Sequence, residues 1–241
     1  MGVCDKAGRS FHIKRHNAIQ RRILEFFRAR GFAARIEEKV GEDASRDRTD
    51  VTVPDFPKEK EEADGTRTCE FLELHIDVAV VDNTCDSAIR LGASTKQGAW
   101  AEFTAKRKVD HYQPILSRRS PQCVIKPAVV ETHGFIHDSL RSLLKSLAYH
   151  STKQAVAGLD EMVSSKQFRL LYGLELNSLY QEFAVAVVNA VIGTIESAAE
   201  KVIQDSPQSR RSTDNHLSLL GRNKLARRLE TAHKTMCAYW E

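Results

Sequence analysis

Hydrophobic and polar positions change period several times along the chain, and each change predicts a different element. Between 11 and 30 the apolar residues recur at helical spacing, and Gly31 follows as a helix stop. Residues 32–40 have the pattern of a short edge strand, and 49–53 alternate like a second strand. Residues 69–81 are apolar at nearly every position, which predicts a strand buried on both faces.

The second half of the chain is predicted to be mainly helical. The elements expected there are a helical turn at 87–91, helices at 99–112, 135–149, 152–163 and 176–203, and a strand at 123–130. Pro114 is expected to end one helix, and Gly193 to break the last. Residues 54–68 are charged and hold two prolines, which predicts an exposed loop or hairpin tip. The order predicts an α/β fold with a mixed central sheet between helices.

Three segments follow from this pattern. Residues 1–150 form the predicted α/β core, 151–204 a helical extension, and 205–241 a linker with a basic amphipathic tail helix. No apolar run approaches bilayer-spanning length, so no membrane partner is expected. The five cysteines are scattered without a CxxC pair, which indicates reduced thiols in an intracellular protein. The oligomeric state is left open.

Charge is distributed unevenly around a net value of +4. Residues 1–39 hold ten Lys and Arg against four Asp and Glu, and 206–241 hold seven against three. Residues 42–73 hold five against eleven. Basic surfaces attract phosphate backbones and clustered acids bind hard cations, although charge alone fits an ordinary solvated surface equally well.

Two aspartates and a lysine are the candidate chemical residues. Asp77 lies inside the apolar strand at 69–81, where a carboxylate is costly unless a metal ion or a hydrogen-bond network compensates it. Asp50 begins the neighbouring strand, and Lys108 lies on the helix that follows. Each acid alone fits an ordinary strand-end carboxylate or ion pair. Together they fit a site that holds a hard divalent cation against a phosphate.

In their order along the chain, these residues resemble the restriction-like endonuclease of site-specific non-LTR retrotransposons, a branch of the PD-(D/E)XK nucleases. That family carries an Arg/Lys-His-Asn motif, a Pro-Asp or similar pair, an Asp-Val-x-Val strand, and a lysine followed one turn later by tyrosine. The matching residues are Arg15, His16 and Asn17; Thr49 and Asp50; Asp77, Val78, Ala79 and Val80; and Lys108 with Tyr112. The resemblance covers residues 4–148.

The resemblance implies metal-dependent hydrolysis of a DNA phosphodiester. Asp50 and Asp77 would hold Mg²⁺ or Mn²⁺, and Lys108 would assist the attacking water. Lys106 competes for that role, but Lys108 precedes Tyr112 by one helical turn. Of the adjacent Glu37 and Glu38, strand alternation turns one inward, and Glu38 is taken as a third metal ligand. The residues expected to contact DNA are Lys14, Arg15, His16, Asn17 and Tyr112.

Two positions and one interval depart from the family pattern. Thr49 stands where a proline is usual, the interval from Asp50 to Asp77 is long, and Ala79 stands where the wider superfamily places a lysine. RNA or a reverse transcriptase are further partners that the resemblance implies, together with a nuclear location. A zinc site is not predicted, because Cys4, the one cysteine near the N-terminal histidines, is too few for a complete ligand set.

Two alternatives stay open. One is a nucleic-acid-binding remnant that kept the fold and lost the chemistry. The other is a protein-interaction scaffold built on the C-terminal helices, which predicts that the carboxylates of Asp50 and Asp77 do not converge.

Overall fold

The computed structural model describes residues 5–40, 47–61, 67–93, 95–120, 122–157 and 163–205. The chain forms two compact units, one of residues 16–186 and one that joins 1–15 to 187–241. The first unit contains the sheet, and the described parts of the second, 5–15 and 187–205, are helical. The polar turn predicted around 41–46, Cys4, and the linker and tail helix predicted beyond residue 205 lie outside the described residues.

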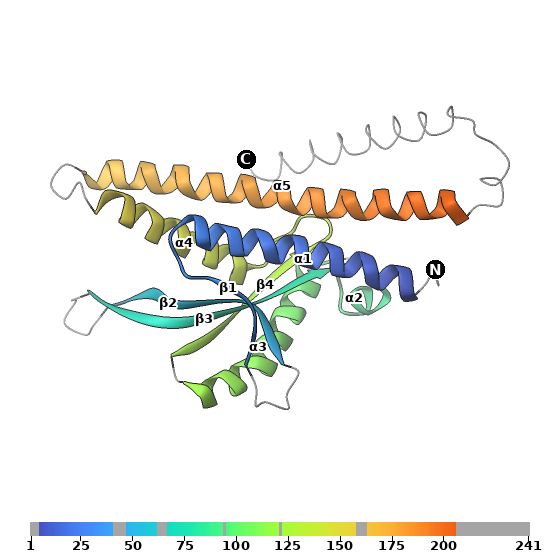
Figure 1. The fold of residues 1–241 in the computed structure, drawn as a ribbon, viewed down its shortest axis with the longest axis horizontal. Helices are drawn as coiled ribbons and strands as arrows, with labels where there is room; N and C mark the ends of the chain where they lie inside the picture. The colour runs from blue at the N-terminus through green and yellow to red at the C-terminus, as the bar shows by residue number, and fades with distance from the viewer. Residues whose placement is uncertain are drawn as a thin grey trace. The chain divides into compact units, whose positions relative to one another are not determined.

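Four strands form one sheet in the order β1-β2-β3-β4 (Figure 1). The elements are α1 (Asp5–Ala29), β1 (Arg35–Lys39), β2 (Arg48–Glu61), β3 (Arg67–Val81), α2 (Asp86–Arg90), α3 (Ala99–Arg119), β4 (Cys123–Glu131), α4 (Asp138–Val156) and α5 (Ser165–Asp205). β2 pairs antiparallel with β1 and β3, whereas β3 and β4 are parallel. A parallel pair needs a crossover, which here contains α3. The predicted mixed sheet flanked by helices is therefore confirmed.

Helices cover both faces of the sheet within residues 16–186 (Figure 1). On one face, Ala79 and Val81 of β3 pack against α3. On the other, the ring of Phe56 in β2 contacts Phe27 of α1, with centroids 5.8 Å apart, and His150 of α4, at 5.5 Å. A central strand between two helical layers has no solvated face there, which agrees with the continuous run of buried residues at 74–78 in β3.

Of the two alternatives predicted for 54–68, the exposed loop is wrong, whereas the hairpin agrees with β2 and β3, which continue through most of it as a two-stranded arm. Pairing between β1 and β2 extends only to Thr52, so among the described residues the outer edge of β2 has no neighbouring strand beyond that point. Pro54 and Pro57 lie on this edge, where a missing N–H costs no ladder hydrogen bond. Pro54 also falls at a register shift, next to Asp55 with φ +55°.

Three predicted helix ends are wrong, and in α3 and α4 the reason is that burial continues past the predicted end. α3 runs through Pro114, which is exposed, and Leu116 beyond it is fully buried. α4 is one helix where two were predicted, because its buried stripe continues to Thr152. α5 passes through Gly193 without interruption. Among the described residues, no helix has the length and apolar content that a membrane crossing requires.

Candidate active site

Asp50 lies where β2 leaves β3. The last pair of that ladder joins Val51 to Ile76, and Asp50 is the next residue. Its Oδ2 accepts a hydrogen bond of 2.6 Å from the backbone N–H of Val78. Because β2 and β3 separate at this point, the carboxylate replaces the backbone acceptor that β2 no longer provides for this N–H. Gln20 of α1 donates from Nε2 to the Asp50 carbonyl at 3.0 Å, which fixes the backbone at the same point.

Asp77 lies on β3, between β2 and β4, and its side chain is 8% exposed. Lys108 reaches it from α3 through an ion pair between Nζ and Oδ2. Lys106, the competing lysine, is exposed. Lys108 was favoured because it precedes Tyr112 by four residues, and positions i and i+4 share one side of a helix. In the structure this is the side of α3 that faces the sheet.

The carboxyl groups of Asp50 and Asp77 lie within hydrogen-bonding distance of each other. Burial raises the pKa of Asp50 to about 8, and the hydrogen bond and negative charge of Asp77 add to this rise. The N–H of Val78 and the charge of Lys108 act in the opposite direction. At neutral pH the pair therefore holds a proton between two carboxylates that repel each other when both are ionised.

His16 is the residue of the Arg-His-Asn motif that contacts the pair. Its Nε2 lies 3.1 Å from Oδ1 of Asp50. Burial lowers the pKa of His16, and the positive charge of Lys108 lowers it further. The imidazole is thus mainly neutral, with Nε2–H donating to Asp50. Its Nδ1 is buried and has no hydrogen-bond partner among the described residues.

Tyr112 supports the backbone beside the site. Its hydroxyl donates to the carbonyl of Arg48 at 3.0 Å, and its ring packs against the buried cluster that contains Leu116. Burial raises the pKa of Tyr112 to about 12, with the charges of nearby aspartates adding to the rise, Asp77 most strongly. The phenol therefore stays protonated at working pH and acts as a hydrogen-bond donor rather than as a base.

Glu38 is not brought to the aspartate pair. Its Oε1 accepts a hydrogen bond of 3.3 Å from Arg119, at the end of α3. The neighbouring Glu37 lies opposite Asp50 in the register and acts electrostatically on His16, although it is exposed. Glu37 has φ +53°, and Glu38 is the half-buried residue of the two, as strand alternation predicted, but its carboxylate lies beside Arg119.

The other predicted DNA contacts lie on α1. Lys14 and Asn17 are exposed, and Arg15 is half-buried and donates to Nδ1 of His12 at 2.7 Å. Lys14 and Arg15 belong to the unit that contains the chain's first 15 residues, whereas Asn17 belongs to the unit with the sheet.

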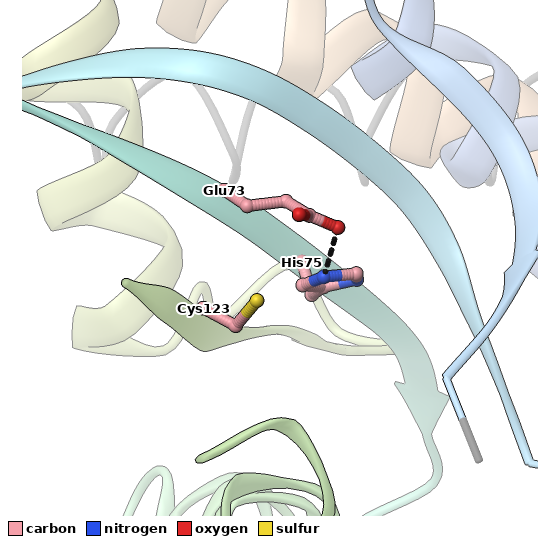
Figure 2. A group of neighbouring side chains, drawn as sticks. All are labelled: Glu73, His75 and Cys123. Atoms are coloured by element: carbon pink, nitrogen blue, oxygen red, sulfur yellow. Dashed lines mark hydrogen bonds and ion pairs between the residues drawn. The ribbon is translucent and has the colours of Figure 1, made fainter. Parts of the chain in front are cut away.

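A second cluster of chemically active side chains was missed by the sequence reasoning. Glu73, His75 and Cys123 bring one ligand-type atom each to within 4.8 Å of the others (Figure 2). Burial lowers the pKa of His75 and raises that of the Cys123 thiol. Strand alternation places Glu73 and His75 on one face of β3. Cys123 lies far away along the chain, so its place beside them could not be predicted from the sequence.

The aspartate pair has the donor chemistry that a hard divalent cation requires. Two carboxylates meet at one point, and one has a strongly raised pKa because it is buried and lies beside the other. Oxygen donors of this kind suit Mg²⁺ or Mn²⁺, which are bound through a few carboxylates with water completing the shell. Asp50 and Asp77 therefore fit such an ion.

Comparison with protein-family models and with curated proteins finds no matching family and no matching protein.

Proposed function

We propose that this protein is a divalent-metal-dependent DNA endonuclease of the PD-(D/E)XK type, derived from a retroelement. One observation carries the proposal: the carboxyl groups of Asp50 and Asp77 converge beside the ammonium group of Lys108. The three residues come from different elements, so their convergence is a property of the fold rather than of local sequence.

Each residue then has a distinct task. Asp50 and Asp77 would hold Mg²⁺ or Mn²⁺, and the bound ion supplies charge that polarises a phosphate and activates water. Lys108 carries positive charge to the place where a phosphate would gain negative charge, or orients the attacking water. His16 donates to Asp50 and holds its carboxylate in one orientation. Lys14, Arg15 and Asn17 are assigned to the DNA backbone.

The first test is plasmid nicking with Mg²⁺ and with chelator. Asp77→Asn keeps the size and hydrogen-bonding capacity of the side chain and removes its charge. We expect it to reduce magnesium-dependent nicking by at least about 100-fold, the scale at which loss of one electrostatic contact to a transition state is felt. Asp110→Asn, at an exposed position of α3, is the matched control and should nick like the parent protein. Equal nicking by the purified Asp77→Asn protein would exclude this site.

A binding module without catalysis is the second candidate, and one observation favours it. His16 contacts Asp50 and Lys108 pairs with Asp77, so the carboxylates have partners without any metal. DNA binding measured beside cleavage separates the two functions. Binding with no cleavage under any divalent metal assigns the module, and binding with cleavage that Asp77→Asn removes assigns the enzyme. The scaffold alternative required the two carboxylates to lie apart, and they do not.

Partners and location follow from the proposed origin. A retroelement-derived nuclease works on nuclear DNA, and RNA or a reverse transcriptase would be its further partners. DNA binding should weaken steeply with salt, because contacts to phosphates release counterions.

A further inference from the structure

The Glu73–His75–Cys123 cluster is assembled by the sheet itself. In the parallel pairing of β3 with β4, Glu73 lies opposite Cys123, and His75 follows Glu73 by two residues on the same face. His75 is fully buried and Cys123 is 1% exposed. Figure 2 shows the three side chains turned toward a common point from the two strands. A carboxylate, an imidazole and a thiol in this arrangement are the ligand types that zinc takes.

The ring of His75 is held so that either tautomer is satisfied. Nδ1 lies 3.0 Å from the hydroxyl of Thr49 and 3.2 Å from that of Thr52, and Nε2 lies 3.0 Å from Oε1 of Glu73. A hydroxyl can donate or accept. With Nε2–H donating to Glu73, the threonines donate to Nδ1. With the proton on Nδ1, a threonine accepts it and Nε2 presents a free lone pair to the cluster.

The guanidinium group of Arg119 supplies a positive charge beside this cluster, where a metal cation would otherwise lie. The same guanidinium nitrogen lies 3.1 Å from Glu73 and 3.3 Å from Glu38. Its side chain is 41% exposed and ends α3, so it can swing into solvent without disturbing the core. Removing it leaves the carboxylate of Glu73, the imidazole of His75 and the thiol of Cys123 without a competing positive charge.

We propose that Glu73, His75 and Cys123 form a binding site for a zinc-class divalent cation, which takes the place of Arg119. On binding, the Cys123 thiol loses its proton to solvent as the metal–sulfur bond forms, and His75 keeps one proton, now on Nδ1. The threonine hydroxyls then hold the ring by its outer nitrogen, as metal-bound histidines usually require. The ion ties β3 to β4. It is separate from the aspartate pair and independent of any nuclease activity.

Cobalt titration of the full-length, chelator-treated protein tests the site. A Co²⁺–thiolate bond absorbs in the near ultraviolet and oxygen ligands do not, so the aspartate pair is silent. We expect a saturable band of one equivalent that Zn²⁺ abolishes by competition, and a rise in melting temperature with Zn²⁺. Cys123→Ala should remove the band and lower Zn²⁺ affinity by more than roughly 100-fold, because losing a ligand costs more than losing a residue that supports one. Cys69→Ala, at an exposed cysteine, is the matched control and should keep both.

Two further variants keep the test decisive if Cys123→Ala folds poorly. Arg119→Gln should raise Zn²⁺ affinity by about tenfold, because it removes the competing charge, whereas a purely structural arginine would leave that affinity unchanged. A Thr49→Val, Thr52→Val double variant should lower affinity by about tenfold, because it removes both hydroxyls that hold the outer nitrogen of the histidine. A folded parent protein without the thiolate band, or a band that survives Cys123→Ala, would overturn the proposal. An Asp50→Asn, Asp77→Asn double variant should bind cobalt like the parent protein, and loss of the band there would also contradict it.

Discussion

Because the pKa of Asp50 is raised, the stability of the metal-free protein depends on pH through this residue. In the unfolded chain this carboxyl group ionises near its ordinary pKa of 3.8, but in the folded protein it keeps its proton up to about pH 8. Between these values the folded state binds more protons than the unfolded state. The free energy of unfolding therefore falls as pH rises through this window.

We predict that Asp50→Asn flattens this dependence in the presence of chelator. Asparagine resembles the protonated acid and never acquires charge, so above pH 8 the variant should be more stable than the parent protein by about 1–3 kcal/mol, the usual range for relieving an unfavourable buried charge. Urea unfolding at pH 5 and pH 9 measures the difference. Asp110→Asn should keep the parent slope, and a parallel slope for Asp50→Asn would show that another group is responsible.

The position of α3 decides whether Lys108 reaches the sheet, and Gly98 sets where that helix begins. Gly98 has φ +79° and is the N-cap residue of α3. A Cβ added there would lie 2.4 Å from the ring of Phe135. Both the left-handed backbone and the close ring exclude a side chain at this position.

We predict that Gly98→Ala lowers the free energy of unfolding by about 2–4 kcal/mol, combining backbone strain with a steric overlap. Gly173→Ala is the matched control, because Gly173 lies within α5 with open space around the added Cβ. It should raise stability by about 0.5–1 kcal/mol, the ordinary gain of alanine over glycine in a helix. Urea unfolding measures both, and similar values for the two variants would contradict the role given to Gly98.

At the scale of the molecule, the first half of α5 belongs to the same compact unit as the sheet. That unit extends to Ala186, whereas the sequence pattern assigned 151–204 to a separate extension. Phe183 is fully buried, with its ring centroid 6.3 Å from that of Phe26 in α1. Arg30 of α1 forms an ion pair of 2.6 Å with Glu175 of α5. The helix is thus part of the layer that covers the sheet.

We predict that Phe183→Ala lowers the free energy of unfolding of the sheet-containing unit by about 3–5 kcal/mol, the cost of removing a buried phenylalanine ring. Val185→Ala, two residues away and 54% exposed, should change it by less than about 0.5 kcal/mol. Denaturation followed by circular dichroism compares the two variants. If Phe183→Ala left the unfolding of the sheet unchanged, the helix would be an independent extension.

Much of the element order was readable from the sequence. Residues 69–81 were apolar at nearly every position because β3 is covered on both faces, and Gly31, with φ +80°, ended the first helix as expected. The extent of the arm formed by β2 and β3 could not be predicted, because Pro54 and Pro57 indicate a turn unless they lie on an unpaired strand edge. Which edge is unpaired depends on where β1 stops, and local sequence does not contain that information.

The sequence by itself determined which residues carry charge in apolar surroundings, and so it singled out Asp50, Asp77 and Lys108. Helical spacing also favoured Lys108 over Lys106. Only the tertiary structure decided which side chains lie next to one another, because strand register and backbone conformation bring distant segments together. Register joined Glu73 to Cys123. Alternation correctly made Glu38 more buried than Glu37, but the carboxylate of Glu38 lies beside Arg119 at the end of α3.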